Sequence, residues 1–101
     1  GDTNMKLQQI RFILAIAEHD LNISKAAKHL YTSQPGVSRQ LRLLEEELGI
    51  NIFVRNGKQL VNTTEQGDVV LEKFKSIELL YAFQTLNRWQ IRLLAFQTRL
   101  I

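Results

Sequence analysis

The chain of 101 residues contains no cysteine and no long uninterrupted apolar run. Without cysteine it can form neither a disulfide framework nor a thiolate metal site. A membrane span needs about 18 or more consecutive apolar residues, and the sequence has no such run. The chain also does not open with the charged and apolar regions of a secretory signal. We therefore expect a soluble intracellular protein with no membrane contact.

The residue constellations of enzymes are also missing. His19 and His29 have no carboxylate or cysteine partner at ligand spacing, and there is no nucleophile elbow or phosphate-binding glycine-rich loop. The run of glutamates at 45–47 could be read as a catalytic carboxylate pair. Consecutive helical residues point in different directions, however, so we interpret the run as a solvated face. We expect no enzyme, no catalytic residue, no bound metal and no cofactor.

The composition is that of one small folded domain, alone or with an appended helix. Hydrophobic residues make up 45% of the chain, enough for a core. Thirteen Lys and Arg against ten Asp and Glu give a net charge of +3, which is too mildly basic to prove a nucleic-acid partner. Residues 1–4 precede Met5 and resemble an expression remnant or an upstream extension, so we leave them out of the fold prediction.

Two short helices are predicted in the first third of the chain. Apolar residues at helical spacing predict a helix over residues 6–18; they are Leu7, Ile10, Ile13, Leu14, Ile16 and Ala17. A second helix is expected with Ser24 as N-cap, Ile23 before it as a hydrophobic staple, and a buried face of Ala26, Ala27 and Leu30. Its alanines allow the close helix crossing that a helix-turn-helix unit requires. Lys25 and Lys28 lie off that face, as solvated charges or as contacts to a phosphate backbone.

A third helix follows a turn at residues 31–33. Ser33 can cap it, and Pro35 fits in its first turn, where a missing N–H costs nothing. Apolar residues at intervals of four, three and four form its buried stripe, namely Val37, Leu41, Leu44 and Leu48. Gly49 is expected to end the helix in a left-handed conformation.

The polar residues of this third helix indicate base recognition. Gln34, Ser38, Arg39 and Arg42 point away from the buried stripe. Glutamine can pair with adenine and arginine with guanine, and the N-terminal end of such a helix enters the major groove. Gly36 should cost about 1 kcal/mol relative to alanine; it allows a close approach to DNA or relieves crowding where helices cross. The glutamates at the far end would be repelled by phosphates, so only the start of the helix should face DNA.

A hairpin is predicted after Gly49. Residues 52–55 and 59–62 read as two short strands, and Asn56-Gly57 is a strong turn signal between them. A two-stranded ribbon after a helix-turn-helix is a wing. Arg55 and Lys58 would flank its tip, beside the DNA backbone or minor groove, or would only keep the hairpin soluble.

A long helix is predicted next, capped by Thr63 or Thr64 with Glu65 in its first turn. Gly67 in that turn suggests close packing against the domain body. Apolar residues at roughly helical spacing need a partner, which a second copy of the chain would supply; we assign dimerisation to Val70, Phe74, Ile77 and Tyr81. The less regular tail from residue 79 allows deeper dimer packing, a membrane-surface helix, or a terminus that is not a folded unit. Trp89 is interpreted as interface or core.

The order of these motifs resembles the N-terminal DNA-binding domain of LysR-type transcriptional regulators over residues 5–67. The matching segments are 7–12 (LQQIRF), 26–30 (AAKHL), 33–41 (SQPGVSRQL), 44–49 (LEEELG), 52–55 (IFVR) and 64–67 (TEQG). Segments 21–24 (LNIS), 31–36 (YTSQPG) and 57–58 (GK) resemble the CysB-like subgroup, which regulates sulfur assimilation and cysteine biosynthesis.

The resemblance implies a mainly α-helical fold. A winged helix-turn-helix of three helices and a two-stranded β wing would occupy residues 5–63. A long linker or dimerisation helix with the less regular tail would occupy residues 64–101. Base-edge contacts would come from Gln34, Pro35, Ser38 and Arg39. Backbone or minor-groove contacts would come from Ser24, Lys28, Thr32, Ser33, Arg42, Arg55 and Lys58.

The expected function is sequence-specific binding of double-stranded DNA by a homodimer on a partly palindromic promoter site. We expect this in the cytoplasm, at the nucleoid. The subgroup resemblance implies genes of sulfur and cysteine metabolism as targets. Family members normally continue into an effector domain, which these 101 residues do not include, so a small-molecule effector would act only through that domain. The alternative is a winged-helix interaction or dimerisation module without specific DNA binding.

Overall fold

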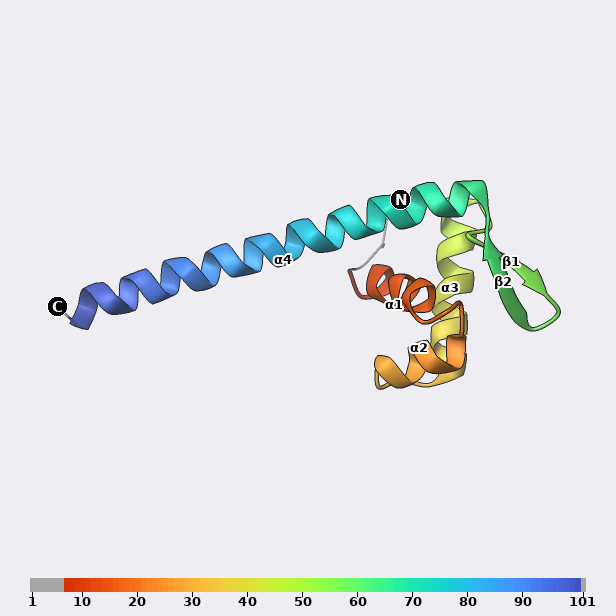
Figure 1. The fold of residues 1–101 in the computed structure, drawn as a ribbon, viewed down its shortest axis with the longest axis horizontal. Helices are drawn as coiled ribbons and strands as arrows, with labels where there is room; N and C mark the ends of the chain where they lie inside the picture. Colours follow the sequence, from red (N-terminus) through yellow and green to blue (C-terminus); the bar gives the residue numbers. More distant parts are fainter. Residues whose placement is uncertain (1–6, 101) are drawn as a thin grey trace.

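The computed structural model describes residues 7–100, with side chains to residue 98, as four helices and one hairpin (Figure 1). The elements are α1 (Leu7–Glu18), α2 (Ile23–His29), α3 (Gln34–Leu48), β1 (Phe53–Asn56), β2 (Gln59–Thr63) and α4 (Glu65–Leu100). The predicted winged helix-turn-helix and the long helix after it are confirmed. The helix start predicted at Lys6 and the interpretation of residues 1–4 lie outside the described residues.

The N-terminus of α2 differs from the prediction. Asn22, not Ser24, is the N-cap, and its side-chain oxygen accepts the N–H of Lys25 at 3.0 Å. The reason is the corner before it, where Asp20 and Leu21 both have left-handed backbones with φ of 59° and 58°. This corner leaves Asn22 extended directly before Ile23, so Ser24 falls inside the first turn.

The predicted ends of α3 are confirmed. The hydroxyl of Ser33 accepts the N–H of Gly36 at 3.1 Å, and Pro35 lies in the first turn. Gly49 ends the helix with φ of 70°, and its N–H donates to the carbonyl of Glu45 at 2.9 Å. The crowding at Gly36 comes from its own cap, since an added Cβ would lie 3.0 Å from the Ser33 hydroxyl.

The hairpin turn lies one residue later than predicted. Asn56 pairs with Gln59, so Gly57 and Lys58 form the turn, and Gly57 has φ of 63°. A glycine with positive φ at the first of two central positions is what a type II′ turn requires. The pairing shifts register between Val54 and Arg55, which introduces a local irregularity into the ribbon.

Helix α4 begins in close contact with the end of the α3–β1 connection. Thr64 caps it, since its hydroxyl accepts the N–H of Gly67 at 2.9 Å. A Cβ added to Gly67 would lie 2.0 Å from the carbonyl oxygen of Ile52, so only glycine fits there. The close packing predicted for Gly67 is confirmed.

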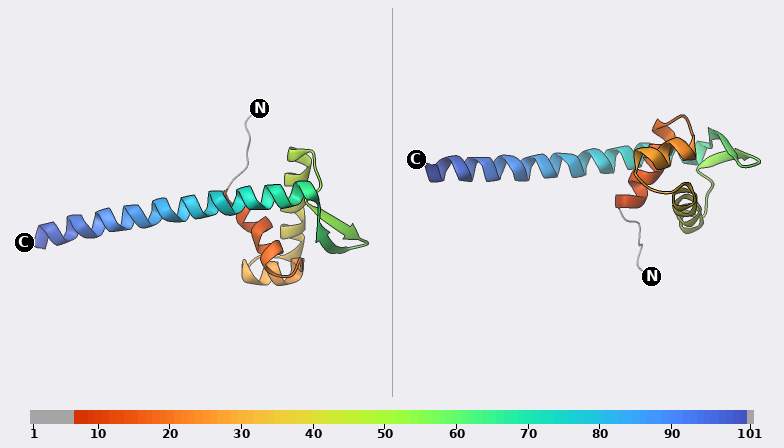
Figure 2. Two further views of the ribbon diagram at one scale, coloured as in Figure 1. Left: turned by 45° about the horizontal axis from the view of Figure 1, so that its top comes forward. Right: turned by 90° about the horizontal axis from the view of Figure 1, so that it is seen from below.

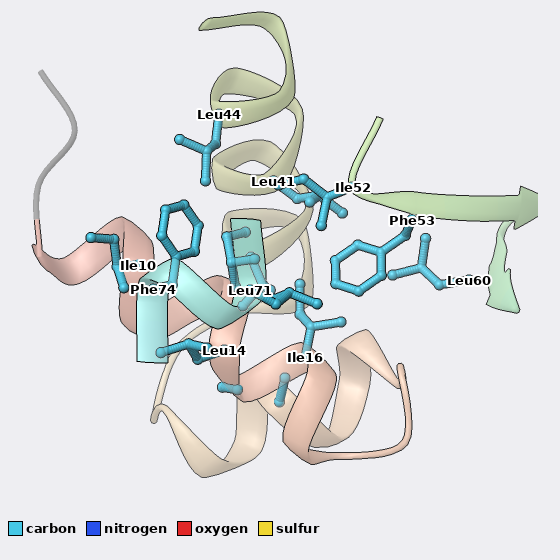
Figure 3. Close-up of a cluster of buried hydrophobic side chains, with 14 of the residues drawn as sticks. Ile10, Leu14, Ile16, Leu41, Leu44, Ile52, Phe53, Leu60, Leu71 and Phe74 are labelled. Carbon is cyan, nitrogen blue, oxygen red and sulfur yellow. The ribbon is translucent and has the colours of Figure 1, made fainter. Parts of the chain in front are cut away.

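The hydrophobic core lies where all four helices meet the base of the hairpin (Figure 3). Leu71 and Phe74 of α4 enter this core and are 7% and 4% exposed. Beyond them α4 leaves the body on the side opposite to the hairpin (Figure 2), which gives the molecule extents of 63 × 30 × 23 Å. Within residues 7–100, no helix is both long and apolar enough to cross a membrane.

Replacement of Gly67 by alanine should destabilise the protein strongly. Alanine favours helix by about 1 kcal/mol, but its methyl group would overlap the backbone of Ile52, so we expect a net loss of about 3 kcal/mol in the free energy of unfolding. Urea unfolding of Gly67→Ala, with Ser76→Ala as an exposed control in the same helix, tests this. A Gly67→Ala protein as stable as the wild type would contradict the contact.

Replacement of Asn22 by alanine should lower the free energy of unfolding by about 1 kcal/mol, because α2 loses its cap. Ser24→Ala is the matched control and should change stability by less than about 0.5 kcal/mol. Thermal unfolding of both variants measures the difference. A larger loss in Ser24→Ala than in Asn22→Ala would restore the cap predicted from the sequence.

Candidate nucleic-acid interface

A groove of about 680 Å³ lies between α3 and the hairpin. Polar and cationic side chains from both elements line it, namely Gln34, Ser38, Arg42, Arg55 and Lys58. The structure thus brings together five residues that the sequence assigned to DNA contact. Two acidic residues, Glu45 and Glu46, also line the groove. Its cationic and hydrogen-bonding groups together suit a phosphate backbone beside base edges.

The base-contact candidates occupy the first turns of α3. Gln34, Pro35 and Arg39 are exposed, and Ser38 is half-buried at the groove wall. Pro35 and Arg39 do not line the groove. The candidates therefore share the N-terminal part of α3 but are divided between the groove and the adjoining helix surface.

The backbone-contact candidates lie around this end of α3. Ser24 and Gln34 meet Lys58 around a second, smaller depression of about 380 Å³ between the α1–α2 corner and the hairpin. Lys28 and Thr32 are exposed outside both depressions. Lys25 forms an ion pair with Asp20 at 3.8 Å, so part of its charge is balanced locally. The Ser33 hydroxyl accepts one hydrogen bond as the cap of α3 and can still donate its own hydrogen to a phosphate.

The solvated face predicted for the three glutamates is wrong for Glu45. Glu46 and Glu47 are exposed, but Glu45 is 8% exposed and turned toward the hairpin. Its Oε2 accepts the N–H of Ile52 at 2.7 Å, and its Oε1 accepts Nη2 of Arg55 at 2.8 Å. The sequence gave no local signal for this, because both partners lie beyond the chain reversal at Gly49.

The predicted position of Arg55 at the hairpin tip also needs correction. Lys58 lies in the turn itself, whereas Arg55 pairs across the ribbon with Leu60 and is drawn toward α3 by Glu45. Its side chain remains 41% exposed and lines the groove. Arg55 therefore faces the groove from strand β1 and not from the turn of the hairpin.

Two features near the interface were missed. Tyr31, in the turn before α3, has a left-handed backbone with φ of 55° and is 97% exposed; such a conformation is a true outlier for a bulky residue. Gln9 of α1 donates from Nε2 to Oε1 of Gln40 at 3.0 Å, which ties α1 to α3. The sequence motifs carry no signal for either feature.

The dimerisation candidates divide into two pairs. Phe74 is buried in the protomer's own core and Val70 packs against that core, so they leave little surface for a second chain. Ile77 and Tyr81 are 44% and 49% exposed. From residue 79 onward α4 carries further large exposed apolar side chains, which are Leu79, Leu80, Phe83, Leu86, Trp89, Ile91, Leu93, Leu94 and Phe96.

Residues 7–68 match the family model described as "Bacterial regulatory helix-turn-helix protein, lysR family". The HTH-type transcriptional regulator CysB of Haemophilus influenzae is 49% identical over 67 residues, which is 66% of this chain and 21% of that protein. The HTH-type transcriptional regulator cbl of Klebsiella aerogenes is 52% identical over 67 residues, with the same shares covered. The chain thus spans about a fifth of the length of these curated relatives.

Solved structures resemble the chain over most of its length. The CbnR_DBD–DNA complex is 32% identical with a TM-score of 0.72, over 85% of this chain and 95% of that one. The BenM_DBD/benA site 1 DNA complex is also 32% identical, with a TM-score of 0.70 over 88% of this chain and 96% of that one.

Proposed function

The chain belongs to the LysR family of bacterial regulatory helix-turn-helix proteins, and we propose that it binds double-stranded DNA sequence-specifically through α3 and the hairpin. The N-terminal part of α3 would read base edges in the major groove, and the hairpin would lie along the backbone or minor groove. Acting on promoters would place it in the bacterial cytoplasm, at the nucleoid.

The groove between α3 and the hairpin is the observation that carries this proposal. Gln34 and Ser38 approach it from α3, and Arg55 and Lys58 approach it from the hairpin. Cationic groups supply affinity and position through phosphates, while amide and hydroxyl groups select bases. The similarity to the CbnR and BenM domains, whose structures are complexes with DNA, supports DNA binding by this chain.

A homodimer on a partly palindromic site is the expected working form. A two-fold symmetric protein reads two half-sites, one with each α3. The exposed apolar side chains of α4, beginning with Ile77 and Tyr81, offer the contact surface. The resemblance to the CysB-like subgroup extends the proposal to genes of sulfur and cysteine metabolism.

A second candidate is an interaction module that dimerises but does not bind DNA specifically. The exposed apolar length of α4 favours it. Selection of bound duplexes from a random pool by the 101-residue chain separates the two. A two-fold symmetric motif supports the proposed function, and a folded protein that recovers no motif supports the interaction module.

Gln34→Ala and Arg39→Ala should each weaken binding to the selected site by about 1–3 kcal/mol and relax preference at particular bases. The reason is the loss of paired hydrogen bonds to a base edge. Titration against the selected duplex and against single-base variants measures both effects. Gln66→Ala, an exposed change on α4, serves as the control. An equal loss on every duplex would refute base reading by these residues.

Lys58→Gln should weaken binding to all duplexes alike. Removing one phosphate contact lowers the slope of log affinity against log salt by about 1. Titrations at several salt concentrations measure the slope, and Lys73→Gln, an exposed lysine on α4, is the matched control. An unchanged slope in Lys58→Gln would argue against a phosphate contact by the hairpin turn.

A further inference from the structure

We propose that Glu45 is a positioning residue of the DNA-binding surface, whose carboxylate holds the Arg55 guanidinium in place to bind a DNA phosphate. This inference rests on the proposed function. It assigns a favourable role in DNA binding to a negative charge that simple electrostatics would count as unfavourable.

Burial of Glu45 shows that its carboxylate is held in place. Among the described side chains, it is the only charged one that is buried. Taking a carboxylate out of water is strongly unfavourable unless strong partners replace the water. Two short charge-assisted bonds do so, one from the Ile52 N–H at 2.7 Å and one from the Arg55 guanidinium at 2.8 Å.

The two bonds reach different parts of the connection to the hairpin. Ile52 directly precedes β1, and Arg55 lies within it, so one side chain of α3 fixes both. The backbone of Glu45 adds to this, since its carbonyl accepts the N–H groups of Gly49 and Ile50 at 2.9 and 3.2 Å. Residue 45 therefore controls where the chain leaves α3 and where the hairpin begins.

The geometry of Arg55 leaves it able to bind a phosphate. Glu45 accepts a hydrogen bond from Nη2 of Arg55. A guanidinium carries five N–H groups in a planar fork, so others can donate to a phosphate. The side chain is 41% exposed and borders the groove. The register irregularity between Val54 and Arg55 supports the assignment, because such irregularities re-aim side chains next to functional sites.

Glu45→Gln tests the proposal, with Glu47→Gln as the matched control. Both variants remove one negative charge from the same helix, but Glu47 is exposed and does not line the groove. Glutamine at position 45 is uncharged and offers one acceptor oxygen where two carboxylate oxygens accepted before, so the charge-assisted bond that holds Arg55 is lost or weakened. We expect Glu45→Gln to bind a mixed-sequence duplex about tenfold more weakly, as for one lost hydrogen bond to a charged group, and with a lower salt slope. Glu47→Gln should bind as the wild type or more tightly.

A double-mutant cycle separates positioning from a general loss of structure. Arg55→Gln should weaken binding to a similar extent, and adding Glu45→Gln to it should cost less than about a further twofold. Equal effects of Glu45→Gln with and without Arg55 would overturn the proposal, as would a Glu45→Gln protein that binds like Glu47→Gln. Absence of DNA binding by the wild type would instead refute the proposed function itself.

Arg55→Lys decides the matter if Glu45→Gln does not fold. Lysine keeps the charge but lacks the fork that can bridge a carboxylate and a phosphate. We expect Arg55→Lys to bind about tenfold more weakly than the wild type, because one of the two partners loses its hydrogen bond. Wild-type affinity in a folded Arg55→Lys protein would show that only the charge matters and would overturn the proposal.

Discussion

The backbone of Ile52 is the point on which the arrangement of this domain depends. Its N–H donates to Glu45 of α3, and its carbonyl accepts the N–H of Thr64 at 3.0 Å, at the start of α4. The same carbonyl packs against Gly67, where no side chain fits, and the Ile52 side chain is fully buried. One residue thus joins α3, the hairpin and α4, so none of the three can move without disturbing a buried hydrogen bond or a backbone contact.

The contacts around Ile52 also affect how charge is distributed over the proposed interface, because Glu45 takes part in them. The first turns of α3 carry Gln34 and Arg39, whereas its last turns carry three glutamates. Glu45 would repel phosphates if it faced solvent, but it is buried and paired with Arg55. Glu45, which belongs to the acidic end of α3, thus pairs with a cationic side chain that lines the groove. Glu46 and Glu47 stay exposed toward the end of α3.

Local signals in the sequence predicted most of the fold. The Ser33 cap and the Gly49 terminus depend on neighbours within a few residues, and both are confirmed. The close packing of Gly67 is also confirmed, although its partner Ile52 lies before the hairpin; a glycine in the first turn of a helix was the signal for it. The errors occur where contacts between distant parts of the chain, or unusual backbone conformations, determine the local structure. Asn22 caps α2 because two consecutive left-handed residues precede it, and Glu45 is buried because its partners come from beyond a chain reversal. Of the candidate site, the grouping of five residues around one groove could be predicted, but the pairing within it could not.

The close packing of Gly67 against Ile52 fixes the base of the long helix α4. Phe74 is the last buried residue among the side chains that the structure describes, and the helix runs on for residues 75–100. This part has a length of about 39 Å at a rise of 1.5 Å per residue. A tilt of about 10° at the base would swing the far end through about 7 Å. Because Gly67 packs directly against the backbone of Ile52, the direction in which α4 leaves the body is fixed relative to α3 and the hairpin. A second chain bound to the outer part of α4 would therefore be held at a defined position relative to the surface proposed to bind DNA.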